Sequence, residues 1–157
     1  MTYLTELPAI QDMTLCLGKE GCLFFTLCEI AERITHTPID VLRKARECIN
    51  LHLVDYVEEN PASHLKEAFW IFDRDKVLSY LTGIEGIVVT KTHSVPKKEQ
   101  IYYIKYATTE PVKTHFVLPD YNGLYYSHTV ANGKIDSYYV VSIPTVKKKT
   151  GVKRAKK

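Results

Sequence analysis

The segment Gly21–Ala31 constrains the fold of this 157-residue chain more than any other stretch of its sequence. Gly21 interrupts a polar run, and the residues that follow indicate a buried helix from about Cys22 to Ile34. The apolar positions at helical spacing are Leu23, Leu27, Ile30 and Ile34. Cys22 then lies in the first helical turn, where free backbone amides and the positive end of the helix dipole favour the nucleophilic thiolate. The alternative is that Cys22 is a small buried hydrophobic residue, as most free cysteines are.

Basic residues are concentrated at the end of the chain. The formal net charge is +3, but Lys147–Lys157 holds seven of the 21 lysines and arginines. The remainder carries fourteen basic against eighteen acidic residues, a formal charge of −4. We therefore expect one mildly acidic domain over residues 1–146 and a basic, disordered tail over residues 147–157.

The cysteines and the hydropathy predict a cytoplasmic protein without a metal. The first dozen residues lack the basic start and apolar run of a secretory signal, and no span approaches the ~20 apolar residues that cross a bilayer. Reduced thiols are therefore expected, and no membrane attachment. Five residues separate Cys16 from Cys22 and Cys22 from Cys28, whereas structural zinc sites usually use closer pairs. No metal or other cofactor is expected.

Two further helices have clear start or stop signals. Thr37 as N-cap and Pro38 at the first helical position, with Asp40 in the first turn, predict a second helix. Asp73 predicts the start of a short helix that runs through Leu81 and ends at Thr82-Gly83. Residues 50–72 between these two helices are ambiguous.

After Gly83 the pattern changes to β-rich runs separated by turn residues. The expected strands are Ile84–Thr92, Ile101–Ala107, Thr114–Leu118, Gly123–Thr129 and Asp136–Ile143. N-terminal helices packed on a C-terminal antiparallel β-sheet make an α+β domain.

The expected sheet contains a histidine that suits a cysteine hydrolase, which needs an imidazole beside the thiolate and a third group to orient it. His115 lies in the short apolar strand. A two-residue turn at Asn122-Gly123 places His128 diagonally from His115 on one face, and a four-residue loop places the two opposite each other. A three-residue loop would turn His128 to the other face. The alternative is that His115 is a histidine whose polar groups are satisfied within a half-buried strand.

These segments together resemble the papain-like cysteine peptidases. The resemblance is carried by Ile10-Gln11-Asp12, by Gly21-Cys22 at the start of an apolar helix, and by His115-Phe116-Val117 followed by Gly123-Leu124-Tyr125-Tyr126. It covers most of residues 10–143, and it is nearest to the bacteriocin-processing branch with its prophage-borne relatives and a spirochaete family of unknown function. The resemblance implies a papain-like fold, with Cys22 as nucleophile, His115 as general base and Gln11 as oxyanion donor.

The chain departs from that family's pattern at three places. Ser127 and His128 occupy the region where the family has Asp or Asn, so the orienting role falls to His128 or to no residue. The third catalytic residue stays open among His128, Ser127, Asn122 and Asp120. Gln11 lies eleven residues before Cys22, farther than the usual short spacing, and Leu23 follows the cysteine where the bacteriocin-type enzymes commonly have glycine.

The expected function is therefore hydrolysis of a peptide or amide bond in a peptide or protein substrate. The altered third position also suits a catalytically inactive papain-like domain that binds a peptide or protein partner. A third hypothesis is nucleic-acid binding, with Lys147–Lys157 on phosphates and Tyr102, Tyr103 and Tyr106 stacked on bases. Against it, short basic tails are usually solvated, and alternating tyrosines usually pack within a sheet.

Overall fold

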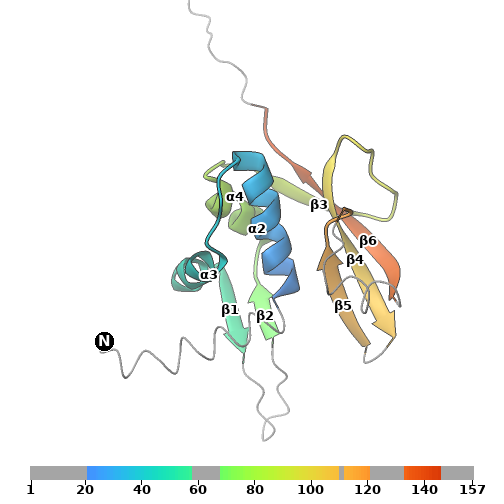
Figure 1. The fold of residues 1–157 in the computed structure, drawn as a ribbon, viewed down its shortest axis with the longest axis horizontal. Coiled ribbons are helices and arrows are strands. Elements are labelled where there is room, and N and C mark those ends of the chain that lie inside the picture. Colours follow the sequence, from blue (N-terminus) through green and yellow to red (C-terminus); the bar gives the residue numbers. More distant parts are fainter. Residues whose placement is uncertain (1–20, 58–67, 110–111, 121–132, 146–157) are drawn as a thin grey trace, which may run out of the picture.

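In a computed structural model of the chain, helices and antiparallel strands are both present, as the α+β prediction requires (Figure 1). The structure describes residues 21–57, 68–109, 112–120 and 133–145. The elements in chain order are α2 (Cys22–Thr35), α3 (Val41–Asn50), β1 (Val54–Val57), β2 (Ala68–Ile71), α4 (Arg74–Thr82), β3 (Val88–Thr92), β4 (Ile101–Thr109), β5 (Val112–Val117) and β6 (Gly133–Ser142).

Helix α2 is the central element of the molecule. It lies between α3, α4 and the β1–β2 hairpin on one side and the larger sheet on the other (Figure 1). The helix starts at Cys22, as predicted, and ends one residue beyond the predicted Ile34, with His36 as a left-handed C-cap at φ 55°. Apolar residues recur around much of its circumference because the helix packs against both neighbours, and those buried are Phe24, Leu27, Cys28, Ile30 and Ala31.

The predicted start of α3 at Thr37 and Pro38 is wrong. The N-cap is Asp40, whose side chain accepts a hydrogen bond from the Arg43 backbone N–H at 3.1 Å. Between the helices, the Glu32 carboxylate accepts the Ile39 N–H at 2.7 Å. This contact from α2 satisfies the Ile39 amide outside a helix, so the chain turns into α3 only at Asp40.

The ambiguous residues 50–72 contain an antiparallel hairpin, in which Val54 pairs with Ile71 and Tyr56 with Phe69. Its inner face supplies Val54 and Phe69 to the core. Because this hairpin separates α3 from α4, the order is not simply N-terminal helices followed by a C-terminal sheet. Helix α4 itself is as predicted at both ends, with Asp73 accepting from the Asp75 and Lys76 amides and Gly83 closing the helix at φ 74°.

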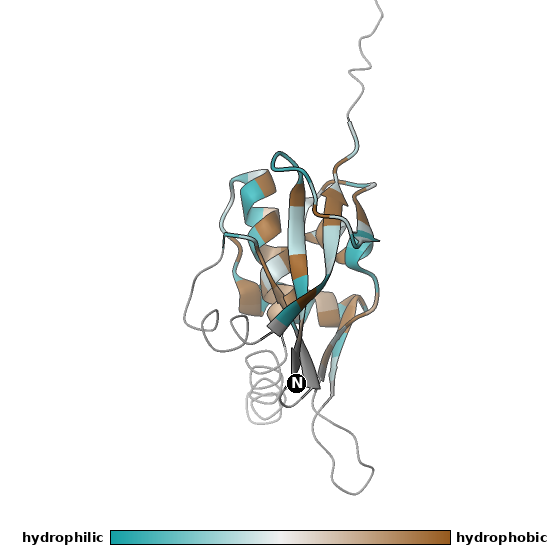
Figure 2. Ribbon diagram, turned by 90° about the vertical axis from the view of Figure 1, so that its right-hand side faces the viewer, coloured by the Kyte–Doolittle hydropathy of each residue, from teal (hydrophilic) through white to brown (hydrophobic). Residues whose placement is uncertain are grey.

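The larger sheet is antiparallel with strand order β3–β6–β4–β5. Four of the five predicted strands correspond to its members, although β3 starts at Val88 rather than Ile84. The predicted strand Gly123–Thr129 lies outside the described residues. Polar and apolar residues alternate along the strands on the side that faces the viewer in Figure 2.

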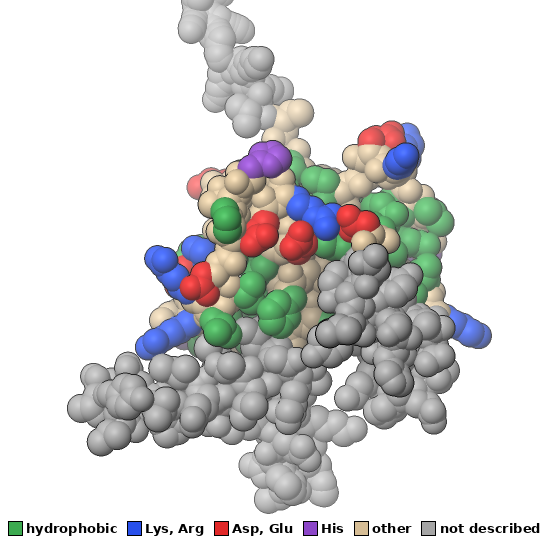
Figure 3. All heavy atoms as spheres, in the orientation of Figure 1, with side chains coloured by type: hydrophobic (Ala, Val, Ile, Leu, Met, Phe, Trp, Pro, Cys, Tyr) green, Lys and Arg blue, Asp and Glu red, His purple; other side chains and the backbone are tan. Residues whose placement is uncertain are grey.

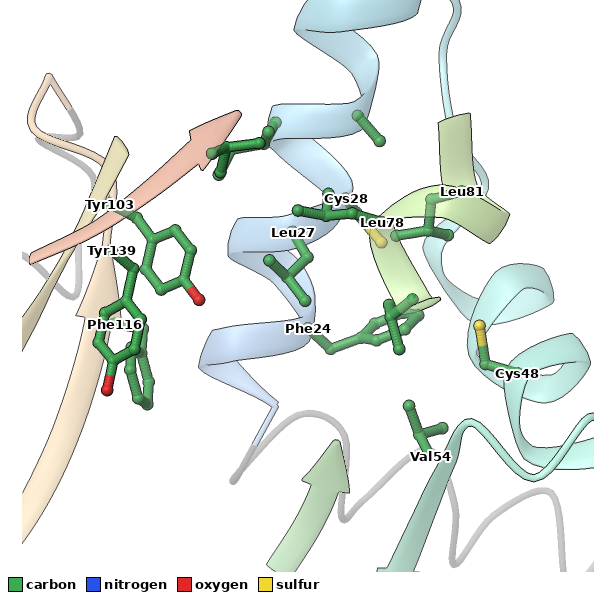
Figure 4. Close-up of a cluster of buried hydrophobic side chains, with 14 of the residues drawn as sticks. Phe24, Leu27, Cys28, Cys48, Val54, Leu78, Leu81, Tyr103, Phe116 and Tyr139 are labelled. Atoms are coloured by element: carbon green, nitrogen blue, oxygen red, sulfur yellow. The ribbon is translucent and has the colours of Figure 1, made fainter. Parts of the chain in front are cut away.

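The two faces of this sheet have different surroundings. Tyr103, Phe116 and Tyr139 point toward α2 and join one core that continues to the far side of that helix (Figure 4). The opposite face carries a smaller cluster, which we call the outer cluster: Ile104, Val117, Tyr102, Tyr106 and Tyr138. None of the helices that the structure describes is long and apolar enough to cross a bilayer.

Candidate cysteine–histidine site

Cys22 is the first residue of α2 and is half-buried. Its N-cap, Gly21, has no side chain with which to accept a hydrogen bond from the first turn, and the first bond within the helix joins the Phe25 N–H to the Gly21 carbonyl at 2.9 Å. The backbone amides of the first turn therefore point along the helix axis without a helical acceptor. They and the helix dipole favour negative charge at this position.

The other two cysteines in the described part of the chain are unsuited to nucleophilic chemistry. Burial is the main cause that raises the pKa of the Cys28 thiol to about 12 and that of Cys48 to about 11. Both residues belong to the core around α2 (Figure 4). Near neutral pH they are protonated and screened from solvent, whereas Cys22 is in part accessible.

His115 lies on β5, directly opposite Tyr106 of β4. The residue is half-buried, and burial lowers the pKa of its imidazole from the ordinary value of 6.5. The ring is therefore neutral at pH 7 and can accept a proton, as a general base must.

Two contacts show how α2 lies along β5. The Thr26 hydroxyl donates to the Phe116 carbonyl at 3.1 Å, and Arg33 pairs with Asp120 at 3.1 Å. On the face shown in Figure 3, acidic and basic side chains lie next to one another across the middle of the molecule. In the two contacts with α2, the higher residue number on the helix is paired with the higher number on the β5 side, so the helix and the strand run in the same direction.

This alignment places Cys22 at the level of His115. Cys22 precedes Thr26 by one helical turn, which is a rise of about 6 Å at about 1.5 Å per residue. A strand rises about 3.3 Å per residue, so a point about 6 Å before Phe116 along β5 lies at positions 114–115. His115 points to the opposite face from Phe116, because adjacent strand residues alternate. Phe116 faces α2, so His115 lies at the same level as Cys22 but on the opposite face of β5, which is the last strand of its sheet.

The remaining predicted site residues are distributed differently. Gln11, Asn122, Ser127 and His128 lie outside the described residues, so the predicted His115–His128 pair stays a prediction. Asp120 is described, and its carboxylate is paired with Arg33 beyond the end of β5. It does not lie beside His115 in the sheet register.

Sequence reasoning missed two residues beside this site, Thr26 and Tyr106. Thr26 follows Cys22 by one helical turn, so its position on the same side of the helix was readable from the 3.6-residue period. Its acceptor on β5 was not readable. Tyr106 faces His115 because of the register of β4 and β5, in which Thr109 pairs with Val112. The two residues between Thr109 and Val112 in the sequence are the local signal that could have given this register.

The tyrosines of the nucleic-acid hypothesis do not share one surface. Tyr103 is 0% exposed and packs parallel to Tyr139 with ring centroids 5.0 Å apart. It is therefore unavailable to stack on a base, whereas Tyr102 and Tyr106 lie on the opposite face in the outer cluster. The basic tail lies outside the described residues.

No group of three or more metal-ligating side chains close enough to hold an ion occurs among residues 21–57, 68–109, 112–120 and 133–145. Comparisons of the chain with protein-family models, with curated protein sequences and with solved structures found no match.

Proposed function

We propose that the protein is a papain-like cysteine hydrolase that cleaves a peptide or amide bond, with Cys22 as nucleophile and His115 as general base. The observation that carries this proposal is the hydrogen bond from Thr26 to the Phe116 carbonyl, which holds the first turns of α2 at the level of His115. The expected role of each residue follows from its chemistry. A half-exposed thiol begins a helix, and a neutral imidazole lies on the adjacent strand.

The reaction begins when His115 takes the proton of the Cys22 thiol and the thiolate attacks the substrate carbonyl carbon. The carbonyl π electrons move to oxygen, and the resulting oxyanion is stabilised by first-turn amides of α2, including that of Cys22. The imidazolium gives its proton to the leaving amine as the C–N bond breaks, which leaves a thioester on Cys22. His115 then accepts a proton from water as the hydroxide attacks the thioester, and the acid product leaves with regeneration of the thiol.

The resemblance to papain-like peptidases adds two assignments to this proposal. Gln11 would donate a second hydrogen bond to the oxyanion, and His128 would orient the His115 ring. Both roles are consistent with the chemistry of an amide donor and an imidazole partner.

The first experiment measures the alkylation rate of every cysteine against pH, with the labelled sites assigned by mass spectrometry. Below pH 7, Cys22 should react faster than Cys28 and Cys48. Each unit by which the Cys22 pKa falls below about 8.5, the ordinary cysteine value, should raise its thiolate fraction, and so its alkylation rate, on the order of tenfold. His115→Ala should remove this advantage. His93→Ala is the matched control, because His93 is exposed after β3 and should not change the rate.

A Cys22 thiol as inert as Cys28 and Cys48 would end the hydrolase proposal. The fold would then be better explained as a non-catalytic scaffold that binds a peptide or protein. A reactive Cys22 that depends on His115 would justify a screen of peptide and amide substrates, with Cys22→Ser as the inactive reference.

A further inference from the structure

The residue that faces His115 across the β4–β5 ladder is Tyr106. Directly opposite residues in an antiparallel pair have Cβ atoms about 4.5–5.5 Å apart, and aromatic rings at such positions contact their cross-strand partner. Tyr106 also packs against the buried pair Ile104 and Val117 of the outer cluster. The Tyr106 ring is thus packed against apolar side chains that lie on the same face of the sheet as the His115 imidazole.

An irregularity in the sheet lies beside this pair. Lys105 pairs with Ser137 of β6, but Tyr106 pairs with Ile135, so one residue of β6, Asp136, has no partner in the ladder. Such a bulge changes the direction of the side chains beside it, and bulges are over-represented next to active sites. The irregularity is at the row of the sheet that contains His115.

We infer that Tyr106 is a positioning residue for His115, with its ring forming a wall that holds the imidazole at the β5 edge and excludes water from one side of it. The catalytic importance of this wall rests on the proposed function, but the contact itself does not. A wall of this kind keeps the imidazole neutral and in one orientation, as a general base requires.

The observed properties of His115 agree with this role. The cause that lowers its pKa is burial, which disfavours the charged ring. Among the groups that can titrate, Tyr106 on β4 faces His115 across the ladder. Lys105, on the other face of β4, is paired with Asp136 of β6 at 3.7 Å.

The test is an NMR titration of the His115 ring in the full chain carrying Cys22→Ser, so that no thiolate contributes to the pKa. Tyr106→Ala should raise the His115 pKa toward 6.5, the ordinary histidine value, because it exposes the ring to water. Tyr106→Phe keeps the aromatic wall and should leave the pKa unchanged. Tyr102→Ala is the matched control, since Tyr102 lies on the same strand and face but packs against Tyr138 at 6.0 Å.

An unchanged or lower His115 pKa in Tyr106→Ala would overturn the inference, as would an equal increase in Tyr102→Ala. If Tyr106→Ala does not fold, Tyr106→Thr keeps a strand-forming residue that is too short to cover the imidazole and should also raise the His115 pKa. These outcomes are independent of catalysis. An inert Cys22 in the alkylation experiment would end the proposed hydrolase while leaving the contact between Tyr106 and His115 to be judged by the titration alone.

Discussion

The Thr26 hydroxyl joins the two elements of the candidate site. It lies 2.8 Å from the Cys22 carbonyl and 3.1 Å from the Phe116 carbonyl, and it has a single proton to donate. The first contact is the ordinary bond of a threonine to its own helix. The second crosses to β5, so only this one relates the position of Cys22 to that of His115.

Thr26→Val should therefore affect both stability and Cys22. Valine has nearly the same shape but leaves the buried Phe116 carbonyl without this donor, which should cost about 1–3 kcal/mol of unfolding free energy. The pH-dependent alkylation of Cys22 should also slow, because the helix start is no longer held against β5. Denaturant unfolding and thiol alkylation measure the two effects.

Thr35→Val is the control for this experiment. Thr35 lies in the same helix and donates to the Ala31 carbonyl at 2.8 Å, a bond that stays within the helix. If the two variants change stability and Cys22 reactivity equally, the hydrogen bond to Phe116 does not position the site.

At the scale of elements, a carboxylate joins α3 to α4. Glu47 accepts a hydrogen bond from the Tyr80 hydroxyl at 2.6 Å and pairs with Lys44 at 3.0 Å. The hydrogen bond from Tyr80 is the largest cause that lowers the pKa of Glu47 to about 2, and the bond from Lys44 is the next. The hydrogen bond between Tyr80 and Glu47 also raises the pKa of Tyr80 to about 12. Lys44 also lies 5.1 Å from the centre of the Tyr80 ring.

Tyr80→Phe should reduce stability in a pH-dependent way. A carboxylate whose folded pKa is lowered stabilises the fold above its ordinary value of 4.5, and this contribution is lost as the pH falls toward 2. The difference in unfolding free energy between wild type and Tyr80→Phe should therefore be full at pH 7 and shrink below pH 4.5. Urea unfolding across this pH range measures it.

Tyr102→Phe serves as the control, because the Tyr102 hydroxyl makes no hydrogen bond within the part of the chain that the structure describes and its ring still contacts Tyr138. A stability difference for Tyr80→Phe that does not change with pH would show that the hydroxyl stabilises the fold through a group other than Glu47.

At the scale of the whole molecule, one core extends through α2 from the hairpin to the sheet (Figure 4). Arg74, at the start of α4, crosses the same boundary. Its guanidinium lies 4.2 Å from the Tyr139 ring centre, and its Nη1 donates to the Tyr103 hydroxyl at 3.3 Å. A cation–π contact of this kind contributes about 0.5–2 kcal/mol.

We expect the helical side and the sheet to unfold as one cooperative unit. In native-state hydrogen exchange, Arg74→Met should lower the opening free energies of amides in α4 and β6 by the same amount, about 0.5–2 kcal/mol. Lys76→Met, an exposed substitution in the same helix, should change neither. Loss of protection in α4 while β6 stays protected would show two independent units.

The sequence by itself determined the features that depend on neighbours along the chain. The start of α2 at Cys22, the Asp73 and Gly83 caps of α4, and most of the strands followed from helical or alternating spacing and from capping chemistry. The candidate residues Cys22 and His115 were also identified in this way, because their chemistry is a property of the residue type and of its element.

Only the tertiary structure decided the features that depend on contacts between distant segments. Glu32 of α2 holds the Ile39 amide and so delays the start of α3, which capping signals had placed at Thr37. The β1–β2 hairpin is formed from a segment with mixed local preferences because its Val54 and Phe69 are buried beneath α2. Pairing and packing energies outweigh local propensity at these positions.

The same reason applies to the site. The two residues between Thr109 and Val112 fix the register of β4 and β5 and thus the face on which His115 lies, but no local pattern aligns α2 with β5. The bond from Thr26 to Phe116 sets the alignment of α2 along β5. The sequence identified the two candidate residues, and packing of α2 against β5 decided that they lie at the same level.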